Sequence, residues 1–398
     1  MTTLRLVEHG TTQAVPLAPD QVRDLQAAGI VASAVPGLLP GTWDLTAAAR
    51  VGAVRIGVLD VVIDPKLPVH RVLHLLGLSG QADVFRHADI DLADSAGLVD
   101  VMATLLARLA DRALAAGVLQ GYRAHEESSM VVRGRIDLAA QLRRRHGIPL
   151  PVEVRYDEFD TDIPENQVLR AACRRMLLAP GIHPRARHGL AAVTRRLGDV
   201  ADLVPGVPPP AWRPTRLNQR YVPALRVADL VLAAASVDLG HGTTPVPGFL
   251  VDLARVFEGL LEAHLAPRLA ARGGRCGAQR QWPLDDQARA TIRPDLVWFG
   301  AGGVPRAVID AKYKGGSLPN ADLYQLIAYC TRLGLTDGHL VSAAGERPVA
   351  TRTMLVSGLR VHEHSLALDA DAQQLEAGLD RLAVAIASRA RPRPPDTL

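Results

Sequence analysis

The stretch of sequence that most constrains the fold is RPDLVWFGAGGVPRAVIDAKYK, residues 293–314. Two apolar runs flank the glycine-rich turn GAGG, a pattern typical of a hairpin of buried antiparallel strands. Asp310 and Lys312 interrupt the second run two positions apart, so they project from one face, while Ile309 and Ala311 face the other way. Because burying an unpaired charge is costly, the pair requires each other, a metal ion or water in a cleft. These residues alone leave a structural ion pair and a chemical site equally open.

A second acidic residue favours the chemical site. Asp295 follows Pro294 at the start of the first strand, and the turn would bring Asp295 beside Asp310. Two neighbouring carboxylates repel each other unless a cation lies between them. Hard oxygen ligands of this kind suit Mg²⁺ or Mn²⁺ better than zinc. The sequence therefore predicts a divalent-cation site at this end of the hairpin.

The segment upstream of the hairpin has the spacing of an amphipathic helix. FLVDLARVFEGLLEAHLAPRLAARGG predicts a helix over residues 249–271, closed by Gly273 and Gly274. Glu258 and Glu262 lie one turn apart on this helix and share a face. Glu258 is the candidate for the site, and a plain solvent-facing pair is the alternative.

The segment downstream of the hairpin also has helical spacing. ADLYQLIAYCTRLGL places Asp322, Gln325 and Tyr329 on one face, against the apolar Leu326 and Cys330. This polar face is predicted to line the cleft. An ordinary amphipathic helix would have the same pattern.

The whole chain predicts a multi-domain α/β (α+β) protein. Its 398 residues are enough for two or three domains. The patterns predict a β-rich domain over residues 1–95, a mainly helical region over 96–240 and a mixed sheet flanked by helices over 241–390. The proline-rich residues 391–398 are predicted to be a disordered tail.

Bulk properties exclude several classes of protein. The formal net charge of +4 permits nucleic-acid binding without requiring it. Cys173, Cys276 and Cys330 are far apart and form no CxxC pair, which argues against a disulfide framework and a thiolate zinc site. No segment reaches the ~20 apolar residues that a membrane helix needs. The sequence thus predicts a cytoplasmic protein that is not bound to membranes.

Several motifs together resemble a known family. Pro294-Asp295 and Asp310-Ala311-Lys312 resemble the PD-(D/E)xK nuclease motif. Together with FLVDLARVFEGLLEAHL and ADLYQLIAYC, this hairpin resembles the McrC family, the nuclease subunit of McrBC methylation-dependent restriction systems. DVVIDPKLPVHRVLHLLG, VRGRIDL, YDEFDTDIPENQVLRAA and RYVPALRVADLVL extend the resemblance over most of the chain, except roughly the first 45 residues and the tail.

The resemblance implies a metal-dependent DNA endonuclease of an anti-phage restriction system, with a restriction-endonuclease-like C-terminal sheet. Its expected partners are double-stranded DNA, methylated or otherwise modified, and a McrB-like AAA+ GTPase or NTPase motor, in a hetero-oligomeric complex. The sequence contains no Walker A motif, so nucleotide hydrolysis would belong to the motor. The β-rich N-terminal domain is the expected contact with the motor and would stimulate its hydrolysis.

The resemblance also implies roles for individual residues. Asp295, Asp310 and Glu258, with the carbonyl of Ala311, are expected to hold Mg²⁺ or Mn²⁺. Lys312 is expected to position the attacking water or to offset the developing negative charge. Gln325 and Tyr329 are expected to orient the lysine, the water or the DNA backbone.

Two other functions compete with this interpretation. The chain would be a catalytically silent adaptor that activates an AAA+ NTPase, although an adaptor has no use for a pair of metal-binding carboxylates. A DNA-repair nuclease of the same fold would explain the C-terminal part and leave the N-terminal resemblance without a reason.

Overall fold

The computed structural model describes residues 2–78, 97–146, 148–204, 206–235, 248–313, 319–343, 348–368 and 370–390. The protein is a mixed α/β protein of more than one domain, and its two compact units are each built from separate stretches of chain. Unit 1 consists of Met1–Leu4, Gly52–Val62 and Asp89–Leu250; unit 2 consists of Arg5–Val51, Ile63–Ala88 and Val251–Leu398. The predicted domain boundaries at 95/96 and 240/241, and the predicted tail 391–398, lie outside the described residues.

The N-terminal part of the chain is rich in strands. Its elements are β1 (Thr2–Val7), β2 (Thr11–Pro16), α1 (Pro19–Ala27), β3 (Val31–Pro36), β4 (Thr42–Ala47), β5 (Arg50–Ile56), β6 (Leu59–Asp64) and α2 (Val69–Leu78). Strands β2, β4 and β3 form one antiparallel sheet in that order. A second sheet has the order β1-β6-β5-β10, where β10 is Gly248–Asp252.

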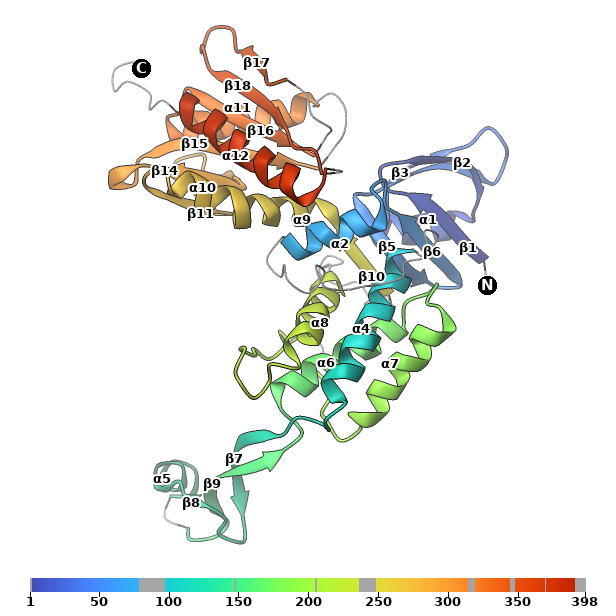
Figure 1. The fold of residues 1–398 in the computed structure, drawn as a ribbon, viewed down its shortest axis with the longest axis vertical. Coiled ribbons are helices and arrows are strands. Elements are labelled where there is room, and N and C mark those ends of the chain that lie inside the picture. The colour runs from blue at the N-terminus through green and yellow to red at the C-terminus, as the bar shows by residue number, and fades with distance from the viewer. Residues whose placement is uncertain are drawn as a thin grey trace. The chain divides into compact units, whose positions relative to one another are not determined.

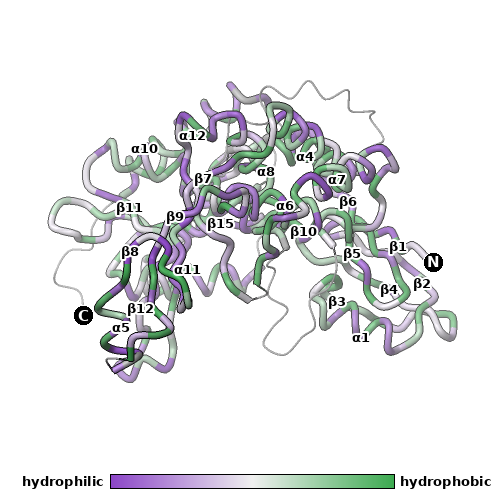
Figure 2. Tube along the Cα trace, turned by 90° about the horizontal axis from the view of Figure 1, so that it is seen from below, coloured by the Kyte–Doolittle hydropathy of each residue, from purple (hydrophilic) through white to green (hydrophobic). Residues whose placement is uncertain are grey.

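The middle of the chain contains helices and a long strand pair. Its elements are α4 (Leu98–Leu114), β7 (Gly121–Ser129), β8 (Arg135–Ile136), α5 (Leu138–Arg145), β9 (Val152–Asp160), α6 (Pro164–Leu177), α7 (Pro184–Arg196) and α8 (Val222–Ala235). Helices α4, α6, α7 and α8 pack together. Hydrophobic residues are frequent along α4 and α8 (Figure 2). The antiparallel pair β7–β9 extends away from these helices (Figure 1). The sequence patterns did not predict this strand pair.

The C-terminal part is a sheet between helices. Its elements are α9 (Leu253–Leu260), a π-helical turn (Leu261–Leu265), α10 (Ala266–Ala270), β11 (Arg275–Ala278), β12 (Trp282–Pro283), β13 (Thr291–Ile292), β14 (Leu296–Phe299), a 3₁₀ turn (Ala301–Gly303), β15 (Pro305–Lys312), α11 (Asn320–Leu333), β16 (Asp337–Ser342), β17 (Ala350–Thr353), β18 (Arg360–Ser365) and α12 (Ala372–Arg389). The sheet has the order β11-β14-β15-β16-β18-β17. Strands β11, β14 and β15 are antiparallel, whereas β15, β16 and β18 run parallel, so the sheet is mixed.

Both faces of this sheet are covered, which explains the near-continuous apolar strands. On one face, Ile309, Ala311 and Val341 pack with residues of α9, α10 and α12. Figure 1 shows α10 and α12 beside the strands of this sheet. On the other face, Val308 and Leu340 pack with residues of α11. Asp310 lies between Val308 and Lys312 on the α11 side, as the period-two alternation of the strand predicts. In the described part of the chain, no helix combines the length and apolarity needed to span a bilayer.

The predicted helix over residues 249–271 is wrong at its start. Phe249, Leu250 and Val251 belong to β10 and are buried, and the helix begins only after Asp252. The Asp252 side chain accepts hydrogen bonds from the backbone N–H groups of Ala254 and Arg255, as an N-cap does. The short apolar run before this cap fits a buried strand, which periodicity alone cannot distinguish from a helical turn.

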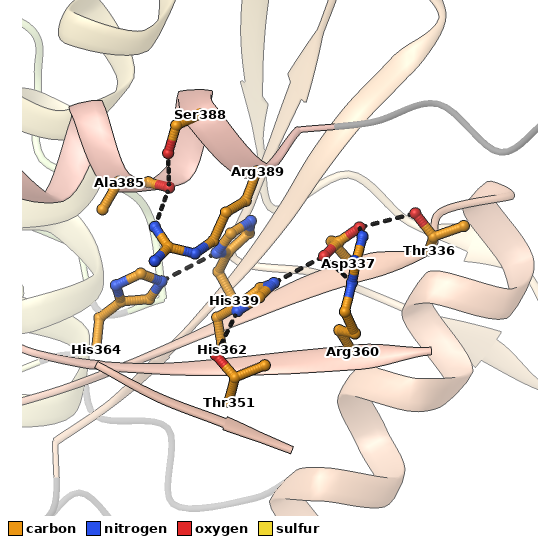
Figure 3. Close-up of polar contacts among 10 residues, drawn as sticks. All are labelled: Thr336, Asp337, His339, Thr351, Arg360, His362, His364, Ala385, Ser388 and Arg389. Carbon is orange, nitrogen blue, oxygen red and sulfur yellow. Dashed lines mark hydrogen bonds and ion pairs between the residues drawn. The ribbon is translucent and has the colours of Figure 1, made fainter. Parts of the chain in front are cut away.

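A polar network lies within the sheet, in strands β16 and β18 (Figure 3). Nδ1 of His339 and Nε2 of His364 are 3.0 Å apart, and the His339 ring is fully buried. His362 donates to Asp337 at 2.7 Å, and Arg360 binds both oxygens of the same carboxylate. Burial alone would raise the pKa of Asp337, but these donors hold it below its ordinary value.

Burial and the neighbouring His362 and Arg389 lower the pKa of His364 from 6.5 to about 3. An unfolded chain therefore takes up a proton at this histidine below about pH 6.5, whereas the folded chain does not. The stability that the neutral ring contributes is present above that pH and is lost as the pH falls toward 3. Acid should thus weaken this unit.

We expect His364→Gln to make unfolding less sensitive to acid. From about pH 7.5 to about pH 5, the wild type should lose about 2 kcal/mol more of its unfolding free energy than the variant, because only the wild type gains this proton on unfolding. Urea titrations at the two pH values measure the difference. Equal losses in both proteins would contradict a neutral, buried His364.

Candidate functional site

The predicted hairpin is confirmed by the strand pairing. Strands β14 and β15 are antiparallel, with Leu296 opposite Ile309, and the 3₁₀ turn between them lies within the predicted GAGG. Gly302 and Gly303 have positive φ angles of 74° and 77°, a conformation that glycine adopts without strain. Because Asp295 immediately precedes β14, the pairing sets it beside Asp310 at the end of the hairpin.

Asp310 and Lys312 form an ion pair on the α11 side of the sheet. Lys312 Nζ lies 2.8 Å from Oδ2 of Asp310, and Asp310 is only 2% exposed. Two residues of α11 complete the surroundings of the ammonium. Oε1 of Gln325 accepts from Nζ at 2.9 Å, and Oδ1 of Asp322 lies 3.5 Å away. The lysine is thereby held between two carboxylates and an amide oxygen.

Asp295 contacts the backbone of the central strand. Its Oδ2 accepts from the N–H of Ala311 at 2.8 Å. The carbonyl of Lys312 accepts from Ala343 on the β16 side. Since N–H and C=O of one strand residue point to the same edge and alternate along the strand, the carbonyl of Ala311 faces the edge where Asp295 lies.

Glu258 joins the cluster through Gln279, which follows β11. The side-chain amide of Gln279 donates to Oδ1 of Asp295 at 2.9 Å and to Oε2 of Glu258 at 3.3 Å. Its oxygen accepts from Nε of Arg293 at 2.6 Å. Glu262, one turn after Glu258, is exposed. We call Glu258, Asp295, Asp310 and Lys312 the acidic cluster, because three carboxylates and one ammonium are joined here by direct contacts or through Gln279 and the Ala311 backbone.

Tyr329 lies on the same face of α11 as Gln325 and is buried. Its hydroxyl donates at 3.3 Å to the carbonyl of Arg293, which is the residue before Pro294. Burial, with Asp310 and Asp295 next in importance, raises the pKa of Tyr329, so the phenol remains protonated. The tyrosine thus ties α11 to the backbone that leads into Asp295.

The carboxyl groups of the acidic cluster are hard to ionise together. Burial, and then the charge of Asp295, raises the pKa of Asp310 to about 7. Burial and the same neighbour raise the pKa of Glu258 to about 7. Burial disfavours the ammonium of Lys312, but Asp310 and Asp322 outweigh it and raise its pKa above the ordinary value. Lys312 therefore stays protonated, which suits an electrostatic role and not that of a base.

Tyr313, the residue after Lys312, is held by contacts with the N-terminal part of unit 2. The hydroxyl of Tyr313 donates to Oε1 of Glu8 at 3.3 Å, and the N–H of Lys66 donates to the same oxygen at 2.7 Å. Glu8 is 1% exposed. Leu75 of α2 packs into the apolar core that contains Ile309 and Ala311. Residues far from the hairpin in sequence thus hold its last strand.

The donor set of the acidic cluster fits a hard divalent cation. All its ligand atoms would be oxygens, and a nearby positive charge would favour the ionised carboxylates that burial and mutual repulsion disfavour. Within the described ranges, no three His, Cys, Asp or Glu side chains already enclose a space for an ion. Mg²⁺ usually takes only one or two carboxylates and completes its shell with water and substrate oxygens. An open cluster is therefore compatible with Mg²⁺.

A protein-family model described as the McrBC 5-methylcytosine restriction system component matches residues 45–342 of the 398. The chain belongs to the McrBC family. The match spans the helical middle part and the β14–β15 hairpin. None of the curated proteins matches the sequence.

Two solved structures are similar to the McrBC family chain. One is the refined half-complex from a tetradecameric assembly of Thermococcus gammatolerans McrB AAA+ hexamers with bound McrC: the TM-score is 0.60 at 17% identity, covering 97% of this chain and all of the other. Another is the cryo-EM structure of the Thermococcus gammatolerans McrBC complex, with a TM-score of 0.40 at 18% identity, covering 68% of this chain and 88% of the other. At such low identity, the first likeness concerns the fold alone.

The structure brings every predicted site residue into one region of unit 2. Asp295, Asp310, Lys312 and Gln325 are linked by direct contacts or through the Ala311 backbone, whereas Glu258 reaches Asp295 only through Gln279. Sequence reasoning missed Gln279 as a member of the site, and it placed Asp322 on the face predicted to line the cleft without giving it a chemical role. The one signal for Gln279 was its place three residues before Trp282 in a segment that precedes Pro294, and that is too weak to identify a contact.

We expect Asp310→Asn to raise stability in buffer that contains a chelator. The change removes a buried negative charge beside Asp295 and should raise the melting temperature by ~2–4 °C, equivalent to about 1 kcal/mol. Asp337→Asn is the matched control, since Asp337 is equally buried but bound by Arg360 and His362, and this variant should melt lower. Thermal melts of the three proteins measure both effects. A lower melting temperature for Asp310→Asn would contradict the repulsion.

Proposed function

We propose that this chain is the DNA-cleaving subunit of a McrBC-type restriction system. It would hydrolyse phosphodiester bonds of double-stranded, modified DNA in an anti-phage defence. The observation that carries the proposal is the acidic cluster: Asp295 and Asp310 meet at the end of an antiparallel strand pair, with Lys312 beside them. This is the arrangement that a PD-(D/E)xK nuclease requires, and it occurs in a chain that belongs to the McrBC family.

Each residue of the cluster has a distinct role in the proposed reaction. Asp295, Asp310 and Glu258, with the carbonyl of Ala311, would hold Mg²⁺ or Mn²⁺. Bound there, the ion would supply an activated water and a positive charge next to the scissile phosphate. Lys312 would stabilise the negative charge that develops on the phosphate oxygens, since its ammonium stays protonated. Gln325 would fix the direction of that ammonium.

The helix α11 would set the geometry of the reacting groups. Gln325 and Asp322 hold Lys312 from one side, while Tyr329 binds the backbone at Arg293. A shift of this helix would move the ammonium relative to Asp310. Because misplacement by about 1 Å can cost a hundredfold in rate, the packing of α11 against the sheet would matter for cleavage.

The proposed partner is an AAA+ motor that hydrolyses GTP or another nucleoside triphosphate. The support is the similar fold of a chain from the assembly of Thermococcus gammatolerans McrB AAA+ hexamers with bound McrC. The absence of a Walker A motif from the sequence assigns hydrolysis to the partner. The β-rich N-terminal part is proposed as the contact that stimulates it. Duplex cleavage would then require two copies of the cutting subunit in a hetero-oligomeric complex.

Cleavage of methylated and unmethylated plasmid by the chain, with its motor, Mg²⁺ and GTP or ATP, tests the function. Asp310→Asn and Lys312→Ala should each lower the cleavage rate by at least about a hundredfold, because each removes charge at the reacting phosphate. Both should still bind the motor and stimulate its hydrolysis. Cutting by both variants at the wild-type rate would refute the site. Stimulation of the motor by a wild type that never cuts would favour the adaptor function.

A comparison of two glutamates on one helix distinguishes the loss of a metal ligand from the loss of a surface charge. Glu258→Gln should weaken Mn²⁺ binding and cleavage about tenfold or more, because Glu258 is a proposed metal ligand that Gln279 links to Asp295. Glu262→Gln, one turn away and exposed, should leave both unchanged. Electron paramagnetic resonance of bound Mn²⁺ gives a readout that does not depend on catalysis. Equal effects of the two changes would remove Glu258 from the proposed metal site.

A further inference from the structure

A short hairpin lies directly beside the acidic cluster. It runs from Gln279 to Arg293, includes the β12–β13 pair, and is named here the 279–293 hairpin. Arg293, at its end, is exposed, and its Nε donates to Gln279. Gln279 in turn donates to both Asp295 and Glu258. An exposed guanidinium is therefore one amide group away from two carboxylates of the cluster.

Gln279 adopts a backbone conformation that is unusual for its residue type. Its φ of 53° lies in the left-handed region, where a residue other than glycine is strained by roughly 1 kcal/mol or more. Its backbone N–H donates to the carbonyl of Asp295. Only an amide side chain can donate to two carboxylates and accept from a guanidinium at the same time. The chain thus sustains strain at the position that connects Arg293 to the cluster.

Two further guanidiniums lie over Trp282 of the same hairpin, one from the hairpin itself and one from α11. Arg280 stacks over the ring of Trp282 at 4.6 Å, and Arg332 of α11 lies over that ring at 5.8 Å. Trp282 is itself stacked near Phe299, with ring centroids 6.3 Å apart. Stacking fixes the plane of a guanidinium while leaving its N–H edge available to a planar or tetrahedral anion. Such an arrangement suits a phosphate group.

These arginines differ from many others in the chain in lacking an acidic partner. Arg360 binds Asp337 and Arg352 binds Glu363, whereas Arg280, Arg293 and Arg332 form no ion pair with a carboxylate among the described residues. All three are exposed. A group of unpaired, oriented guanidiniums next to a carboxylate cluster has the charge to attract a polyanion that the cluster itself would repel.

We propose that the 279–293 hairpin binds the backbone of duplex DNA and guides it to the acidic cluster, with Arg293 and Arg280 each contacting one phosphate. The choice of DNA as occupant rests on the proposed function. Contacts with phosphates position a nucleic acid without reading its sequence. The hairpin therefore binds methylated and unmethylated duplexes alike, and recognition of a modified base belongs elsewhere.

The salt dependence of binding tests this surface without any cleavage. The full chain carries Asp310→Asn and is held in EDTA, and fluorescence anisotropy follows its binding to a labelled duplex of about 30 base pairs at about 50 to 300 mM NaCl. Arg293→Ala and Arg280→Ala should each reduce the slope of log K against log salt by about 0.9, and weaken binding roughly eightfold at about 0.1 M salt. The variant with both Arg280→Ala and Arg293→Ala should reduce the slope by about twice as much as either single change.

Arg272→Ala is the matched control. Arg272 is exposed and lies just after α10, whose Leu269 packs in the core on the opposite face of the sheet from α11 and Trp282. Its guanidinium donates to the carbonyl of Arg268 and forms no ion pair with a carboxylate among the described residues. This change should leave slope and affinity unchanged. Equal slopes for all variants, a loss confined to methylated duplex, or no binding at low salt would overturn the proposal.

The outcome is independent of the nuclease proposal. Reduced slopes in a chain whose wild type never cuts DNA would retain the hairpin as a DNA-binding surface and reject the cleavage. Cleavage with unchanged slopes would retain the nuclease and reject the hairpin.

Discussion

Asp310 is a carboxylate that the fold buries next to another carboxylate. Hydrogen bonding along β14 and β15 places Asp295 beside it, and the apolar residues on either side leave little water to screen the two charges. Lys312 offsets part of this repulsion on the same strand face, and the side-chain amide of Gln279 donates to Asp295. Gln325 and Asp322 in turn hold the ammonium of Lys312 in place.

The architecture of unit 2 explains how such an unfavourable group is retained. Apolar side chains pack against both faces of β15, around Ile309 on one face and Val308 on the other, and fix its position. Helix α11 contributes Asp322, Gln325 and Tyr329 from one direction, and α9 contributes Glu258 from another. A rigid scaffold with several independent supports can hold charges in a geometry that none of the local segments would adopt alone.

Local patterns in the sequence predicted those parts of the site that depend on a single element. Alternation along one strand was enough to place Asp310 and Lys312 together, and a glycine turn was enough to predict the hairpin. The contact between Gln279, Arg293 and Glu258 joins three separate segments, so only tertiary packing defines it. The strand at Phe249 was missed because its apolar run continues into the helix after Asp252. The β7–β9 pair has few buried residues, so its strands lack the apolar alternation that would have indicated it.

The unit that carries the cluster is assembled from both ends of the chain. Glu8 binds Tyr313 and the backbone of Lys66, and Leu75 packs in the apolar core of the sheet. Helix α12, the last described helix, packs against the same core. During synthesis on a ribosome, the early segments emerge long before β15, β18 and α12 exist. A nascent or truncated polypeptide therefore lacks the parts that hold the reactive groups in register. If the chain cuts DNA, this order of assembly delays its toxicity to the host until α12 has been synthesised.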